Sequence, residues 1–104
     1  MSHVYIVNKG CHDYSAAQEY GDLVYLSRDM YSRFSTGKIF RVFREAMRGS
    51  SPEDYILISG LSVMNCVACS IFAAKHQRIN LLLHNSSPQV SDYYVKRTVM
   101  MEDL

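Results

Sequence analysis

The sequence has little excess of either charge and no long apolar run. Its 104 residues carry a formal net charge of +1, so no overall field favours nucleic acid or an anionic membrane as a partner. Polar residues interrupt the apolar runs well short of the roughly 20 residues that span a bilayer. The N-terminus enters a strand-like run at once, without a basic region followed by a long apolar stretch. These absences favour a cytoplasmic protein with no membrane partner.

Tryptophan is absent and cysteine is scarce. Three cysteines, an odd number in a chain long enough to fold without disulfides, are typical of a reducing compartment. Eight tyrosines accompany the missing tryptophan and indicate a contact surface, because tyrosine is enriched in interfaces. Hydrophobic residues make up 48% and charged residues 20%, which excludes a disordered chain and predicts a single domain over residues 1–104.

Strand-like runs alternate with helical patterns along the chain. We predict strands at 3–8, 23–27, 55–59, 79–84 and 93–100, and helices at about 15–20, 37–48 and 63–75. Continuously apolar strands indicate burial on both sides, hence a parallel sheet with helices on both faces. The loop at 85–92 is too short for a helical crossover, so the fifth strand should return antiparallel at an edge. The prediction is an α/β fold, a three-layer flavodoxin-like or Rossmann-like sheet of order 2-1-3-4-5, with a frayed tail at 101–104.

A ligand site is expected where the strand order reverses, beyond the carboxyl ends of the first and third strands. The loops at 8–15 and 59–65 should meet there, and the second loop leads into a helix N-terminus that is compatible with an anion. A phosphate-bearing small molecule such as a nucleotide is the ligand class that this predicts. An ordinary strand-to-helix turn is the competing interpretation, because the glycine there completes no dinucleotide-binding or Walker motif. The candidate contacts are Lys9, His12, Ser59, Gly60, Ser62 and Asn65.

Residues 12–15 (HDYS) form the densest run of chemically able side chains. His12 beside Asp13 could act as a base, and Ser15 could serve as a donor or nucleophile in a hydrolase or transferase. Asp13 and Ser15 are also ordinary residues at the start of a helix, and spacing identifies no second acid or base. We therefore favour a protein without catalytic activity and without a cofactor.

Cys66 and Cys69 have the spacing of a redox or metal motif. A redox pair places its thiolate at an exposed helix N-terminus, whereas these cysteines stand deeper in an apolar helix, and a zinc site would need two further ligands. We predict buried packing cysteines and no metal. The helix at 63–75 has almost no polar face and must be covered on more than one side, which leaves a homodimer interface open.

Residues 28–48 concentrate positive charge, with six cationic side chains against Asp29 and Glu45. Arg41, Arg44 and Arg48 recur at helical spacing opposite the apolar side of the predicted helix. With the nearby Tyr31 and Arg33, this stripe is the predicted partner-binding surface for an acidic protein patch; phosphates of a nucleic acid are a less favoured alternative. A solvated helix face is the competing interpretation.

At 12–15 (HDYS) and again at 55–61 (YILISGL), the chain resembles short proteins encoded by tailed phages. The resemblance rests on no motif of known chemistry and transfers no catalytic residue. It implies a small accessory protein, made in an infected bacterial cell, that binds host machinery, defence proteins or nucleotide signals. We therefore expect a non-enzymatic phage accessory or counter-defence factor that engages a host protein. The alternatives are a binder of a nucleotide-like molecule and a hydrolase or transferase.

Overall fold

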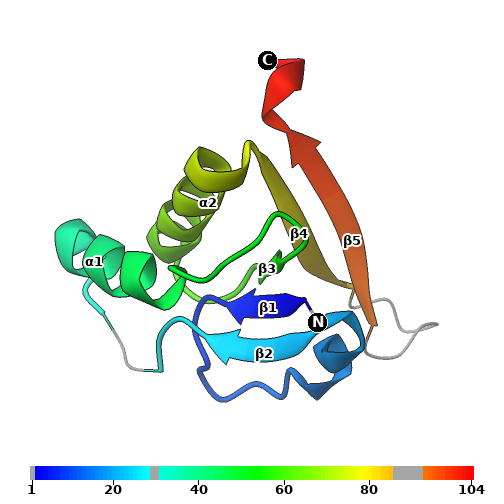
Figure 1. Cartoon of the computed structure of the whole chain (residues 1–104). Helices are drawn as coiled ribbons and strands as arrows, with labels where there is room; N and C mark the ends of the chain where they lie inside the picture. The colour runs from blue at the N-terminus through cyan, green and yellow to red at the C-terminus, as the bar shows by residue number, and fades with distance from the viewer. Residues whose placement is uncertain (1, 29–30, 86–92) are drawn as a thin grey trace.

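The computed structural model describes residues 2–28, 31–85 and 93–104, and in this part of the chain five strands form one sheet (Figure 1). Its order is β2-β1-β3-β4-β5, with β5 antiparallel to β4 and the other neighbouring pairs parallel. The mixed α/β class, the strand order and the antiparallel fifth strand are confirmed. The predicted loop at 85–92 falls, apart from its first residue, outside the described residues, as does Asp29. The strands are β1 (His3–Ile6), β2 (Asp22–Tyr25), β3 (Tyr55–Leu57), β4 (Arg78–Asn85) and β5 (Tyr93–Met100).

Strands β1 and β3 each end two residues earlier than predicted. Beyond β1, the carbonyl of Val7 accepts a hydrogen bond from Ser27 Oγ at 2.8 Å. Beyond β3, the backbone N–H of Ser59 donates to Asn65 Oδ1 at 3.1 Å. Side chains thus join the backbone groups as hydrogen-bond partners beyond both strands, and the two loops begin at the carboxyl edge of the sheet.

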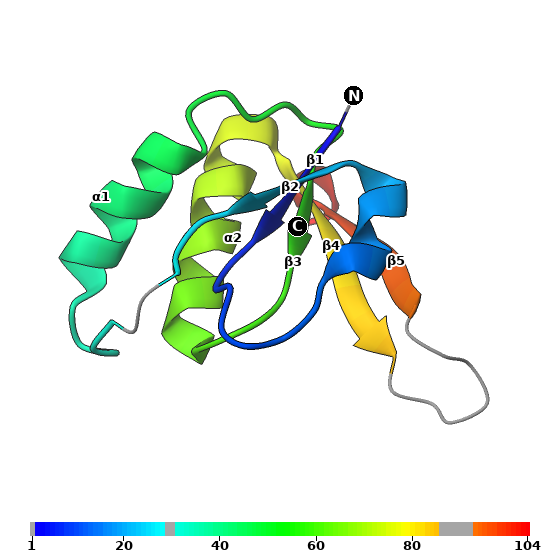
Figure 2. The ribbon, with the colours of Figure 1, turned by 90° about the horizontal axis from the view of Figure 1, so that it is seen from below.

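The helices do not cover the two faces of the sheet equally. Figure 2 shows α1 (Thr36–Ala46) and α2 (Ser62–His76) on one side of the sheet and the 3-10 helix η1 (Ser15–Tyr20) on the other. The predicted three layers are therefore present only in reduced form. The β1–β2 connection uses residues 7–14 to cross the carboxyl edge, which leaves only six residues for a helix. The tail predicted to be frayed forms a second 3-10 helix, η2 (Met101–Asp103).

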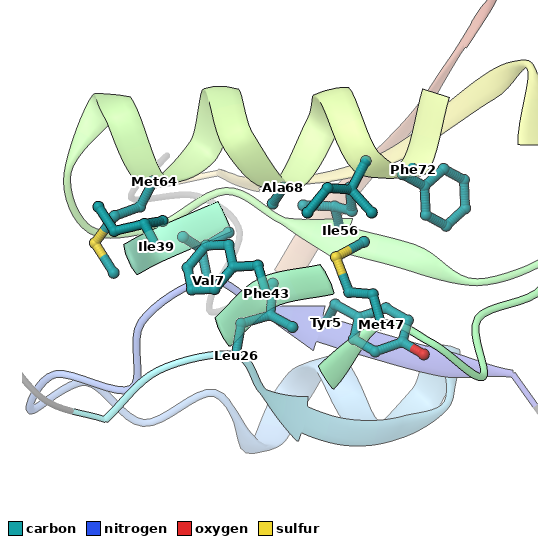
Figure 3. Packing of buried hydrophobic residues seen from close by; sticks show 11 residues of the cluster. Tyr5, Val7, Leu26, Ile39, Phe43, Met47, Ile56, Met64, Ala68 and Phe72 are labelled. Atoms are coloured by element: carbon teal, nitrogen blue, oxygen red, sulfur yellow. The ribbon is translucent and has the colours of Figure 1, made fainter. Parts of the chain in front are cut away.

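The main core lies between the sheet and the two α-helices (Figure 3). Ile39, Phe43 and Met47 recur every four residues, so they lie on one side of α1 and its C-terminal turn, and all three are fully buried. They pack with Met64, Ala68, Ile71 and Phe72 of α2, and with Tyr5, Val7, Leu26 and Ile56 of the sheet and its loops. A smaller core on the opposite face holds Val4, Ile6, Tyr14, Ala17, Leu57, Leu82 and Tyr94.

Helix α2 has a larger solvent-exposed side in the structure than its apolar sequence predicts. Its exposed residues are Ser62, Cys66, Ser70, Ala74 and Lys75. The prediction of two buried cysteines was wrong for Cys66, which is exposed, whereas Cys69 is half-buried and burial raises the pKa of its thiol. Residues three apart on a helix are about 60° apart around its axis, so this pair straddles the boundary between core and solvent. Among the described residues, no group of three or more histidine, cysteine, aspartate or glutamate side chains could hold a metal ion.

A polar network joins β3 and β4 at the amino end of the sheet. Asp54 is 1% exposed and accepts hydrogen bonds from the backbone N–H groups of His3 and Ser51, each at 2.8 Å. Asn80 Nδ2 donates to the carbonyls of Pro52 and Asp54 at 2.7 and 2.8 Å. These bonds satisfy buried polar groups and fix the chain entry to β3. Among the described helices, none is long and apolar enough to cross a membrane.

Candidate functional site

A hollow of about 390 Å³ lies at the carboxyl edge of the sheet. Figure 2 shows the β1–η1 and β3–α2 loops leaving the sheet at this edge. Four predicted residues from these two loops come together in its lining: His12, Asp13, Ser59 and Gly60. The remaining lining residues are Tyr14, Leu57, Ile58, His84 and Tyr94. A hollow therefore exists where the strand order reverses, as expected for this sheet order.

The turn after β3 has a conformation that its residues determine. Gly60 has a φ of +74°, and a Cβ at this position would lie 2.9 Å from the Cβ of Asn8. Asn65 closes the turn: its Oδ1 accepts the Ser59 N–H at 3.1 Å and its Nδ2 donates to the Leu61 carbonyl at 3.1 Å. Asn65 thus braces the turn and does not line the hollow.

The two loops are also joined to each other. The backbone N–H of Asn8 donates to Ser59 Oγ at 3.3 Å. Tyr14, which is 7% exposed, donates its hydroxyl to the Asn8 carbonyl at 3.4 Å. The first bond holds the β1–η1 loop against the β3–α2 turn, and the second closes the β1–η1 loop on itself, so the hollow has a fixed wall on this side.

Aromatic rings dominate the rest of the hollow. The rings of His12 and Tyr14 are 6.1 Å apart, and those of His84 and Tyr94 are 5.6 Å apart. His84 and Tyr94 come from β4 and β5 and were missed in the sequence. The sequence contained a signal for His84, which ends the fourth predicted strand. The carboxyl ends of parallel strands share one edge of a sheet, so His84 could have been expected near the hollow.

The charges around the hollow differ from those predicted. The backbone N–H of Ser15 donates to Asp13 Oδ1 at 2.9 Å and holds the pKa of that carboxyl below its usual value. Lys9 lies with its Nζ 5.9 Å from the centre of the Tyr25 ring. Neither Lys9 nor Ser15 nor Ser62 lines the hollow. Among the described residues that line it, a carboxylate and two imidazoles are the titratable groups besides tyrosine, and no lysine or arginine is present.

The predicted partner surface lies elsewhere, on α1 and the turn after it. Arg41, Arg44 and Arg48 are all exposed. Arg48 pairs with Glu45, and the guanidinium carbon of Arg44 lies 5.4 Å from the centre of the Phe40 ring. Because Phe40 is 43% exposed, positive charge and apolar surface occur together on this helix.

The other two predicted contacts precede α1. Arg33 is exposed, with its guanidinium carbon 4.9 Å from the centre of the Phe34 ring. Tyr31 is half-buried and packs against the main core, and the Nζ of Lys38 lies 5.3 Å from its ring centre. Arg33 therefore extends the basic surface, whereas Tyr31 chiefly anchors this segment to the core.

One comparison with known proteins identifies the family. The model of the phage Pam3 gp32-like protein family matches residues 2–99, a span that runs from just before β1 almost to the end of β5. No curated protein and no solved structure matches the chain. The match confirms the resemblance to phage-encoded proteins. The chain belongs to the phage Pam3 gp32-like protein family.

Proposed function

We propose that the protein is a non-enzymatic binding protein that engages a protein of the bacterial host through the basic side of α1. The observation that carries the proposal is the exposed set Arg41, Arg44 and Arg48 next to a half-exposed phenylalanine. Among the described residues, only Arg48 of the three has a carboxylate within ion-pair distance. Arginine and aromatic side chains are enriched at protein interfaces, and unpaired arginines attract an acidic surface. Membership of a phage protein family supports an accessory or counter-defence role in the host cytoplasm.

Charge reversal tests this proposal. The variant Arg41→Glu/Arg44→Glu/Arg48→Glu should lose a host protein that the tagged wild-type protein captures and cross-links in infected cells. A matched variant, Lys96→Glu/Arg97→Glu, reverses exposed charges on β5 and should retain the same partner. Thermal unfolding of both variants shows that the fold is intact. Equal capture by the wild-type protein and the α1 variant would contradict the proposal.

As a second candidate, we propose that the hollow at the carboxyl edge binds a nucleotide-like molecule. The support is its ring-rich lining, which suits a planar base, beside the turn at the start of α2, which suits a phosphate. The lack of lysine and arginine among its described lining residues favours a ligand with few phosphate groups. The same proposal treats the sheet as flavodoxin-like, which its strand order supports.

A thermal-shift screen tests the second candidate. Nucleosides, nucleoside monophosphates, cyclic dinucleotides and inorganic phosphate are compared, and a ligand at about 100 times its dissociation constant should add about 2.7 kcal/mol of stability. His84→Ala should abolish the shift, whereas Arg41→Glu, on α1 and outside the lining, should retain it. A screen without any shift would contradict ligand binding. Hydrolysis or group transfer by His12 and Asp13 in this hollow would require turnover that disappears in His12→Ala.

A further inference from the structure

A groove of about 440 Å³ lies between α1 and α2, apart from the hollow at the carboxyl edge. The two helices pack side by side (Figures 1 and 2). The apolar part of its lining is Phe40 from α1 with Ile71 and Ala74 from α2. Arg44, Arg48 and Lys75 complete the lining. The groove therefore combines an apolar floor with a cationic rim.

Two of the rim cations, Lys75 and Arg44, are held by contacts of their own, whereas Arg48 forms an exposed ion pair with Glu45. Lys75 Nζ donates to the carbonyls of Met47 and Arg48 at 2.8 and 3.0 Å, where the chain leaves α1. Arg44 lies over the Phe40 ring and has no carboxylate within ion-pair distance among the described residues. Arg41 is on the same helix but does not line the groove. Two of the three arginines of the stripe, Arg44 and Arg48, therefore line the groove together with its apolar floor.

We propose that this groove binds an amphipathic helix whose apolar side fills the floor and whose flanking acidic residues meet Arg44 and Arg48. The inference rests on the proposed engagement of a host protein and names the chemistry of the segment that would be engaged. Helix-in-groove recognition uses apolar anchors at helical spacing. Covering the exposed part of Phe40 removes apolar surface from water, and the cationic rim selects glutamate or aspartate beside the anchors over lysine or arginine.

A synthetic peptide of about 18 residues, long enough to form a helix, serves as the probe. It carries leucines at helical spacing with glutamates on both sides of them, and a second peptide has the same composition in scrambled order. Fluorescence anisotropy should show salt-dependent binding of the first peptide and not of the second. Arg44→Glu/Arg48→Glu should weaken binding by about tenfold or more.

Two single variants distinguish peptide binding in the groove from attraction by positive charge alone. Ala74 is exposed, so Ala74→Phe should fill the groove, keep the fold and weaken peptide binding without changing any charge. Lys38→Glu reverses a charge on the same helix outside the groove and should weaken binding by less than about twofold. Thermal unfolding confirms that each variant is folded.

Several results would overturn the inference. Equal binding of the two peptides, unchanged binding by Ala74→Phe, or an effect of Lys38→Glu as large as that of Arg44→Glu/Arg48→Glu would each do so. Self-association that the groove variants abolish, measured by sedimentation, would assign the groove to a second copy of the chain instead. Host capture that survives Ala74→Phe but not the triple charge reversal would keep the proposed function and reject the groove. Host capture that is unchanged in both Ala74→Phe and the triple charge reversal would reject the proposed function. The peptide measurements would then still show whether the groove binds an acidic amphipathic helix.

Discussion

Gly60 and Asn65 show how single residues build the edge of the hollow. The sequence assigns both to a loop at 59–65, whereas in the structure Asn65 lies in the first turn of α2 and only Gly60 lines the hollow. The carboxamide of Asn65 is hydrogen-bonded to the Ser59 N–H and to the Leu61 carbonyl. A polar residue near a helix start has many partners available within its own turn, so its type alone does not separate a ligand contact from a brace.

Replacing Gly60 by alanine should destabilise the protein. The backbone there has a φ of +74°, and the new Cβ would lie 2.9 Å from that of Asn8. We expect the free energy of unfolding to fall by about 1–3 kcal/mol, as measured by urea denaturation. Gly49→Ala is the matched control, because nothing lies within 4 Å of its Cβ position, and it should change stability little. Similar effects at the two glycines would contradict the strained turn.

At the scale of the elements, the C-terminal ends of α1 and α2 are tied together. Lys75 Nζ donates to the carbonyls of Met47 and Arg48. One residue further, His76 Nε2 is hydrogen-bonded to Ser50 Oγ at 2.8 Å, and its ring lies 4.6 Å from that of Phe72. Burial first, and then the charge of Lys75, lower the pKa of His76 below its usual value of 6.5.

Acidification should loosen this junction. Because the pKa of His76 is lower in the folded protein than in the unfolded chain, the unfolded chain takes up the proton first as the pH falls. The contribution of His76 is therefore present above its usual pKa of 6.5 and is lost below it. Urea denaturation between about pH 7.5 and pH 5 should show a larger fall in stability for the wild-type protein than for His76→Gln. Parallel pH profiles would show that this histidine is not the source.

At the scale of the whole molecule, the centre of the sheet is better protected than its edges. Strands β1, β3 and β4 have partners on both sides, whereas β2 and β5 are edge strands. The main core under α1 and α2 covers one face of the central strands, and the Asp54 and Asn80 bonds fix their amino end. The opposite face is covered chiefly by the short η1.

Hydrogen exchange should follow this arrangement. We expect the slowest amide exchange in β1 and β3, since those amides open only with the whole fold. Exchange in η2 should be fastest among the described elements, because it contains no buried residue. Mass spectrometry after exchange, with peptides that separate β1, β3 and η2, measures this order. Protection in η2 as strong as that in β3 would contradict it.

Much of the fold follows from local sequence patterns. Short apolar runs that alternate with helical patterns predict a parallel sheet and its strand order. The short connection after β4 predicts the antiparallel β5. The apolar spacing of Ile39 and Phe43 likewise predicts the buried side of α1. These features are predictable because the period of side chains along a strand or helix is a property of neighbouring residues.

The site depends on contacts that the local pattern does not contain. The hollow is lined by two loops together with β3, β4 and β5, and its aromatic rings come from positions as distant as His12 and Tyr94. The exposure of Cys66 and the direction of Lys9 away from the hollow depend on how each element packs against the others. By itself, therefore, the sequence determined the order of the strands and the edge where a site would form. Only the tertiary structure decided which side chains meet there, because side-chain direction is set by packing between segments far apart in the chain.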